Sequence, residues 1–350
     1  MQLPISGPRR GSLVCILAAA APLAGSVVSA AEVTLPTVSL GAGMRTSFEN
    51  FDNGTDKSSD FDVDSARLYI NGSVTDKIKF TFNSEYNGNE LILMDAIARF
   101  EYSDKMNIWA GRLLPPSDRA NLYGPYYANN WAVYIDGVQD MWPNTAVGRD
   151  EGVLYWGQFN MVKLSAGVFD VPQTLGPSDS NAFDADLLYA GRAQIDLWDA
   201  EDGYYLNGTY YGDKDLLAFG VAAQSAGDYT AWSADFLFEK KLGNGGAIGV
   251  ESEYYAQTMS GPVTDTDYDG YYGLVHYVFP TMGPGKFQLL AKYGEAGTDG
   301  SPTITTTELN LNYLIKTFNA RGSLFFTEQK SDAVGAQKYT TIGLGLQLQM

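Results

Sequence analysis

The chain has 350 residues, with 41 acidic and 23 basic side chains and a formal net charge of -18. Its mean hydropathy of -0.16 excludes a bundle of membrane helices, because each helix would need an apolar run of about 20 residues. The negative charge argues against nucleic acid as a partner, because this surface would repel the phosphates. Aromatic residues make up 13% and charged residues only 18%, a balance typical of a barrel with two interfacial aromatic girdles.

The N-terminal segment holds the longest apolar run and has the pattern of an export signal. Arg9 and Arg10 precede an apolar stretch over residues 13–24, and small residues come next at a candidate cleavage site. We therefore predict a cleaved signal peptide over residues 1–31 and a mature chain over residues 32–350. A single anchoring helix is the alternative, but the stretch is short and contains a proline.

From residue 33 onward, polar and apolar residues alternate with the period of two that is typical of β-strands. Leu309, Leu311 and Tyr313 alternate in this way with Asn310 and Asn312. A soluble β-sandwich would also alternate, so the connections decide. Very short turns alternate with long polar loops, and the strands suit a tilted span of about 9–11 residues, as in outer-membrane barrels. The predicted turns lie near residues 76, 104, 160, 244, 282 and 316, and the long loops over residues 50–60, 171–184, 257–267 and 330–338.

The order of turns and loops also predicts the number of strands. Counts from the two ends agree on sixteen strands, with both termini periplasmic, if residues 198–215 form one long periplasmic connection. Fourteen or eighteen strands are the alternatives. We therefore predict an all-β fold, a transmembrane antiparallel β-barrel in the outer membrane of a Gram-negative bacterium, reached after export to the periplasm.

One connection, over residues 115–147, is much longer than the turns around it. It is rich in aromatic residues, namely Tyr123, Tyr126, Tyr127, Trp131, Tyr134 and Trp142. A loop of this length is usually functional, and an aromatic loop would be unstable in water. We predict an inward-folded third extracellular loop that packs in the barrel lumen and constricts the channel.

Four segments have residues whose order and spacing resemble a known family. Residues 65–74 (SARLYINGSV) and 78–86 (IKFTFNSEY) are similar to the second and third strands of the phosphate-selective porin O and P family. Residues 111–116 (GRLLPP) resemble the segment entering its constriction loop, and residues 148–153 (GRDEGV) resemble the segment leaving that loop. The resemblance implies a sixteen-stranded trimeric porin with an inward third loop. It does not imply phosphate selectivity, because phosphate-selective members line the pore with basic residues and this chain is acidic. A separate departure is the last residue, Met350, where many outer-membrane barrels end in Phe.

Charged residues in the alternating segments should face the lumen, because a charge facing lipid costs about 2–4 kcal/mol at the membrane midplane. Opposed acidic and basic rows would create a transverse field that orients polar solutes; alternatively, these charges only solvate a wide lumen. The excess of carboxylates suggests a mild cation preference, although much of it lies in loops that could bind divalent ions bridging lipopolysaccharide. The candidates for lining and narrowing the pore are Arg67, Lys79, Arg99, Asp118, Arg119, Asp136, Asp140 and Arg149.

The sequence offers no cofactor site. The one cysteine, Cys15, lies in the predicted signal peptide, so the mature chain has neither a disulfide nor a thiolate metal site. Residues 265–270 (DTDYDG) mimic the start of a calcium-binding loop, but the twelfth position of that motif is His276 instead of Glu. We therefore expect neither a cofactor nor a bound metal ion.

We expect a porin that allows passive diffusion of ions and small hydrophilic solutes, and not an enzyme. The expected partners are outer-membrane lipid and lipopolysaccharide, small ions and solutes, and further copies of the chain in a homotrimer. One alternative is a barrel with a structural or adhesive role, or one that houses a partner protein in its lumen. Another is a membrane hydrolase that uses His276, the only histidine, but no matching serine motif accompanies it.

Overall fold

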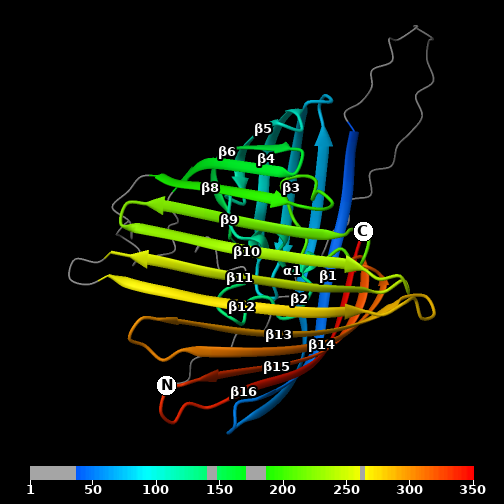
Figure 1. Ribbon diagram of the computed structural model, residues 1–350, viewed down its shortest axis with the longest axis vertical. Coiled ribbons are helices and arrows are strands. Elements are labelled where there is room, and N and C mark those ends of the chain that lie inside the picture. Colours follow the sequence, from blue (N-terminus) through cyan, green and yellow to red (C-terminus); the bar gives the residue numbers. More distant parts are fainter. Residues whose placement is uncertain (1–36, 140–147, 171–186, 261–264) are drawn as a thin grey trace, which may run out of the picture. The chain divides into compact units, whose positions relative to one another are not determined.

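The computed structural model describes residues 37–139, 148–170, 187–260 and 265–350. These residues form a closed barrel of sixteen antiparallel strands, in which β1 pairs with β16 and every other strand pairs with its neighbours in sequence (Figure 1). The prediction of an all-β antiparallel barrel with sixteen strands is confirmed. The predicted signal peptide over residues 1–31 lies outside the described residues.

The strands follow the chain in order around the barrel. Their bounds are β1 (Thr37–Asp52), β2 (Lys57–Ser73), β3 (Ile78–Tyr86), β4 (Leu91–Ser103), β5 (Met106–Leu113), β6 (Asp150–Phe159), β7 (Val162–Asp170), β8 (Leu187–Asp196), β9 (Leu216–Ala226), β10 (Tyr229–Lys241), β11 (Ala247–Met259), β12 (Thr266–Val278), β13 (Lys286–Thr298), β14 (Ile304–Lys316), β15 (Ala320–Ser331) and β16 (Tyr339–Gln349). One short helix, α1 (Arg119–Tyr127), lies between β5 and β6 in the described part of the chain. Within these residues, no helix has the length and apolar character needed to cross a membrane.

Because the strand number is even, β1 starts and β16 ends at the same rim, here called the terminal rim. Residues 197–215 connect the neighbouring strands β8 and β9 at this rim, so they form one long connection, as predicted. The opposite rim, called the distal rim, carries the connection between β5 and β6. It is the third connection at that rim, after those of the β1–β2 and β3–β4 hairpins.

The predicted long loop over residues 50–60 is wrong. β1 and β2 stay paired as far as Asp52 and Lys57, so only a short turn remains between them. The ring centroids of Phe48 and Phe61 lie 4.5 Å apart, and Lys57 Nζ lies 2.8 Å from the Asp52 carboxylate. These cross-strand contacts extend the hairpin through residues whose polar composition indicated a loop.

Side-chain exposure alternates along the strands, with the apolar side chains on the outside. In β9, Phe219 and Val221 are 44% and 56% exposed, whereas Gln224 on the other face is 3% exposed. A soluble sandwich would bury its apolar face, but here the apolar face is the outer surface of a closed barrel. An apolar exterior around a polar interior is what a barrel needs in hydrocarbon, since lipid offers no hydrogen bonds.

Aromatic side chains gather at two levels of the outer wall of β10–β14. Ring contacts near the terminal rim join Tyr277 with Phe279 and Phe287 with Tyr313, and ring contacts nearer the distal rim join Trp232 with Tyr254 and Tyr271 with Tyr293. Aliphatic side chains such as Leu289 and Leu309 lie between these levels. The two levels match the two interfaces of a membrane, where aromatic residues concentrate.

Leu309 lies on the outer face of β14, 49% exposed, in the aliphatic band. We expect Leu309→Arg to destabilise the folded barrel in a bilayer by about 2–4 kcal/mol, because the cation would face hydrocarbon. Urea unfolding in lipid vesicles measures this, with Leu309→Met as the control that keeps an apolar side chain. Equal stability of the two variants would mean that this face does not contact hydrocarbon.

Candidate functional site

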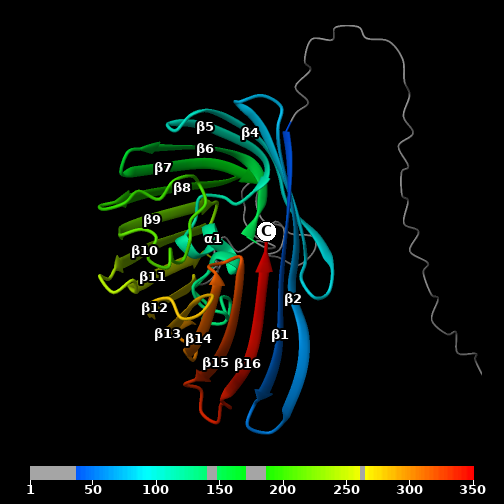
Figure 2. The same cartoon turned by 90° about the vertical axis from the view of Figure 1, so that its right-hand side faces the viewer.

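The connection between β5 and β6 folds into the ring of strands as far as it is described, and we call its residues 114–139 the inner loop (Figures 1 and 2). Its helix α1 is capped by Asp118, whose Oδ2 accepts a hydrogen bond from the backbone N–H of Asn121 (3.0 Å). Gly124 adopts φ +59°, which glycine tolerates best, and interrupts the helix before Pro125. The chain therefore turns inside the lumen and continues along the wall.

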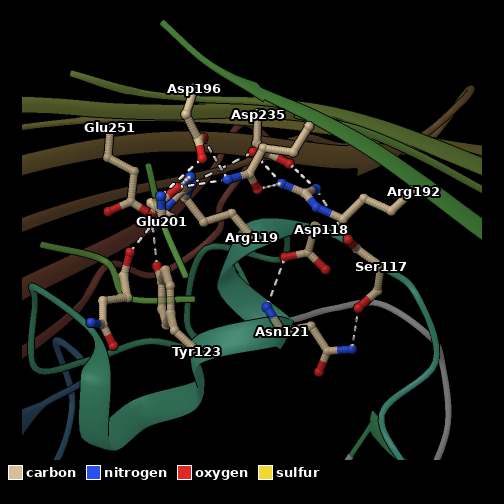
Figure 3. Close-up of polar contacts among 12 residues, drawn as sticks. Ser117, Asp118, Arg119, Asn121, Tyr123, Arg192, Asp196, Glu201, Asp235 and Glu251 are labelled. Carbon is tan, nitrogen blue, oxygen red and sulfur yellow. Dashed lines mark hydrogen bonds and ion pairs between the residues drawn. The ribbon is translucent and has the colours of Figure 1, made fainter. Parts of the chain in front are cut away.

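Arg119 of the inner loop forms a buried ion pair with Glu201 of the connection over residues 197–215, here called the terminal connection (Figure 3). Arg119 Nη1 and Nη2 lie 2.9 and 2.5 Å from the two carboxylate oxygens, and neither side chain is exposed. Burial alone would raise the pKa of Glu201, but the charge and hydrogen bonds of Arg119 hold this pKa below its usual value. Two segments far apart in sequence are thus joined as charged groups.

The terminal connection also folds inward instead of staying at the rim. Backbone N–H groups of Leu206 and Gly208 donate to the carbonyl oxygens of Leu122 and Tyr127 in the inner loop (3.3 and 3.0 Å). The sequence predicted one long connection here but not its inward path. Its aromatic run, GYYLNGTYYG, is the signal that could have revealed this path, by the same reasoning as for the inner loop.

Carboxylates on the inner wall hold the inner loop in place. Glu308 on β14 accepts hydrogen bonds from the backbone N–H groups of Trp131 and Ala132 (2.9 Å each). Glu251 on β11 accepts one from the Tyr123 hydroxyl (2.8 Å), and both carboxylates are completely buried. Part of the acidic row that the sequence places on the lumen face therefore lies beneath the loop.

Two glycines of the inner wall make room for aromatic rings of the inner loop. A Cβ atom at Gly345 would lie 2.4 Å from the Trp131 ring, and one at Gly43 would lie 2.6 Å from the Tyr126 ring. Arg45 donates to the Trp131 carbonyl oxygen (2.8 Å), and its guanidinium lies 4.2 Å from the centre of that ring. The loop is therefore also fixed to β1 and β16, the strands that close the barrel.

The inner loop and the terminal connection leave a cavity with polar and apolar lining against the wall of β2–β4, which we call the aperture. Its volume is about 540 Å³, and it reaches the terminal rim at Gln349 and Met350. The wall contributes Arg67, Tyr69, Asn71, Thr81, Asn83, Asp95 and Arg99 to its lining, and the covering segments contribute Leu114, Asn121, Leu122, Tyr123, Tyr127, Tyr205, Leu206 and Asn207. Arg149, just before β6, also lines it.

Three of the predicted pore residues line the aperture, and each is oriented by a carboxylate. The pairs are Arg67 with Glu85 (3.0 Å), Arg99 with Glu101 (2.5 Å) and Arg149 with Asp95 (3.3 Å). Of the three carboxylates, only Asp95 lines the cavity. The structure therefore brings together Arg67, Arg99 and Arg149 at one cavity.

The other predicted pore residues lie elsewhere. Asp118, Arg119 and Asp136 are buried in the inner loop, where they cap its helix or pair with groups outside the loop. Lys79, near the terminal rim, pairs with Glu101 (2.7 Å) and does not line the aperture. Asp140 lies outside the described residues. Alternation identifies inward-facing side chains, but it does not show which of them the loop covers.

His276 lies on the inner face of β12, beneath the inner loop. Its Nδ1 contacts the side-chain amide of Asn129, and its Nε2 lies 3.9 Å from a carboxylate oxygen of Glu239. The residue is only 5% exposed. Its described contacts therefore connect the wall to the loop and do not face the aperture.

Comparison with known proteins supports the fold. No protein-family model matches the sequence, and no match was found among curated proteins. Solved structures similar to the chain include a loop-deletion mutant of OmpT, an outer membrane protein of Vibrio cholerae (TM-score 0.60, 13% identity, 90% of this chain and 99% of that one). Others are an anion-selective porin from Comamonas acidovorans (0.57, 16%, 90% and 100%) and a trimer form of the Vibrio cholerae protein (0.52, 13%, 90% and 99%). At these identities the likeness shows the fold alone, which is that of a porin-type outer-membrane barrel.

Proposed function

We propose that this protein is a porin that allows passive diffusion of ions and small hydrophilic solutes across the outer membrane of a Gram-negative bacterium. The observation that carries the proposal is the aperture, a cavity of about 540 Å³ with charged and polar side chains in its lining, between the inner wall of a closed barrel and two inward segments. The apolar outer wall and the porin among the structural neighbours support it. The segments similar to the phosphate-selective porin O and P family support the same plan, without phosphate selectivity.

We further propose that the barrel works as a homotrimer surrounded by outer-membrane lipid and lipopolysaccharide. The trimer form of the Vibrio cholerae protein supports this state for a barrel of similar fold. Chemical crosslinking in mild detergent, followed by gel electrophoresis, distinguishes a trimer from a monomer.

Reconstitution into planar lipid bilayers tests the proposed channel. We expect long-lived conductance steps of uniform size, because buried contacts fix the inner loop at β1, β11 and β14. Heat-denatured protein in the same detergent is the control. A folded barrel without steady conductance would instead favour a structural or adhesive barrel, or one that houses a partner. The observation that favours such a barrel is that two long segments of the chain lie inside the lumen.

We also propose that the protein is not an enzyme. We expect His276→Gln to leave conductance unchanged, because glutamine can keep the contact with Asn129. Glutamine cannot act as a base, so the variant would lose any hydrolysis that depends on His276. Single-channel recording of the variant beside the wild-type protein measures this. An ester or lipid hydrolysis shown by the wild-type protein and abolished in His276→Gln would contradict the proposal.

A further inference from the structure

The chain is acidic overall, but most of the inner-wall acid of β10–β14 is hidden from the aperture. Five carboxylates on this described part of the wall are at most 4% exposed: Asp235, Glu239, Glu251, Glu253 and Glu308. Glu251 and Glu308 accept hydrogen bonds from the inner loop, and Glu239 accepts them from the terminal connection. Their charge therefore holds the covering segments and does not face a solute in the aperture.

The charges that line the aperture are mainly basic. Among the side chains that line the described cavity, the three guanidinium groups of Arg67, Arg99 and Arg149 stand against one carboxylate, Asp95, a formal side-chain charge of +2. Glu85 and Glu101, which pair with Arg67 and Arg99, do not line it. Asp95 is 3% exposed, and its two oxygens lie 3.3 Å from Arg149 Nε and 2.7 Å from Asn83 Nδ2. A solute in the cavity therefore meets guanidinium groups directly, whereas two of their three carboxylate partners lie outside the lining.

The guanidinium groups are held in place by the wall. Arg67 directs Nε and Nη2 at Glu85 (3.0 and 3.2 Å). Arg99 directs Nε and Nη2 at Glu101 (2.8 and 2.5 Å) and Nη1 at Thr81 (3.1 Å). The Nε and Nη2 groups of both arginines thus already donate to carboxylates. A passing anion is attracted by the positive charge but cannot form a bidentate pair with these groups. Such a site attracts a solute and also lets it leave, as conduction requires.

Two tyrosines of the covering segments present their rings to the same cavity. Tyr127 and Tyr205 line the aperture and are each 38% exposed. Tyr127 packs against Phe318 and Tyr205 against Trp109, with ring centroids 5.3 and 5.7 Å apart. Burial raises the pKa of both hydroxyls, so the phenols stay uncharged at neutral pH. Fixed, uncharged aromatic surface in a water-filled passage can stack with a flat apolar group.

We propose that the aperture prefers anions and that its best solutes are small carboxylates carrying a flat ring. The carboxylate is drawn to the guanidinium row, and the ring stacks on Tyr127 or Tyr205. The inference rests on the proposed porin function and names the substrate class of the same cavity. It replaces the mild cation preference expected from the sequence, because that expectation included carboxylates that the covering segments hide.

The proposed preference for anions is tested by the reversal potential of the reconstituted channel in a potassium chloride gradient. We expect chloride to permeate at least about threefold better than potassium, since one unit charge about 6 Å away in water changes local ion concentrations by about this factor. Arg99→Gln should lower the ratio and Asp95→Asn should raise it. Lys79→Gln is the matched control, because Lys79 pairs with the same Glu101 as Arg99 but lies outside the aperture lining. A wild-type ratio of one or below, or equal shifts for Arg99→Gln and Lys79→Gln, would overturn the proposal.

The proposed stacking of a solute ring on Tyr127 or Tyr205 is tested by adding sodium benzoate, acetate or phosphate to the open channel. We expect benzoate to interrupt the current at concentrations at which acetate and phosphate do not. Tyr127→Leu should weaken this block at least about threefold, as the loss of one aromatic contact predicts. Tyr134→Leu is the control, because Tyr134 belongs to the same loop but does not line the aperture. Block by phosphate at lower concentration than benzoate, or equal effects of the two variants, would overturn the proposal.

These outcomes separate the inference from the function on which it rests. A barrel without conductance contradicts the porin proposal, and the inference falls with it. A steady conductance that is unselective, cation-selective or insensitive to benzoate leaves the porin standing and overturns only the inference.

Discussion

Arg119→Met is expected to loosen both inward segments and to replace uniform conductance steps with larger, fluctuating ones. The substitution leaves the buried Glu201 carboxylate without its cation, and breaking a buried pair costs about 3–5 kcal/mol. Glu201 then keeps hydrogen bonds from Tyr210 and Gln194 (3.0 and 2.8 Å), which do not supply a positive charge. Because the strand pairing of the barrel does not depend on this pair, the cost falls on the inner loop and the terminal connection. Single-channel recording and urea unfolding measure the two effects.

Two further variants decide whether the lost pairing is the cause. The double variant Arg119→Met with Glu201→Met should regain most of the stability and the uniform steps, because no charge of this pair then remains in the interior. Arg112→Gln removes an arginine from an ion pair whose partner, Glu151, has a side chain 55% exposed, and it should cost less than about 1 kcal/mol. If Arg119→Met behaved like Arg112→Gln, the buried pair would not join the two segments.

The barrel itself could be predicted because every residue of a membrane-spanning strand faces either lipid or the lumen, and the lipid-facing side chains must be apolar. Along β14, Leu309 and Leu311 face outward and Asn310 and Asn312 inward, and this alternation is visible in the sequence without knowledge of any contact. This alternation is no longer required where the strands extend beyond the membrane. Around Phe61, where the side chains of β2 are exposed on both faces, the polar residues indicate a loop although pairing continues.

The site could be predicted only in part, because facing inward and lining the passage are different properties. Arg67 and Glu251 both face inward, but Glu251 lies under the inner loop and Arg67 beside the aperture. That difference depends on the path of the covering segments. The path is set by long-range contacts such as the hydrogen bond from the Tyr204 hydroxyl to the Leu114 carbonyl oxygen (2.8 Å), for which the local pattern gives no sign.

Removing the carboxylate of Glu308 is expected to release the middle of the inner loop from β14. Its Oε1 accepts hydrogen bonds from the backbone N–H groups of Trp131 and Ala132, and its Oε2 accepts one from Asn130 Nδ2 (2.8 Å). Trp131 N–H has a second acceptor, Asn310 Oδ1 (2.9 Å). Glu308→Ala would leave the half-buried Ala132 N–H without this acceptor, so we expect a loss of at least about 2 kcal/mol and an unstable conductance.

The size of the loss can be assigned to the missing hydrogen bonds by comparison with two variants. Glu308→Gln keeps one acceptor oxygen of the same shape and should be milder than Glu308→Ala. Glu328→Ala removes a carboxylate that pairs with the exposed side chains of Lys330 and Lys338 and makes no described contact with the loop, so steady conductance should persist. Limited proteolysis within the inner loop should rise in Glu308→Ala alone. If that variant stayed resistant and steady, the loop would be held by the contacts of Arg45 and Arg321 with its carbonyl oxygens, and Glu308 would only fill a polar space beneath it.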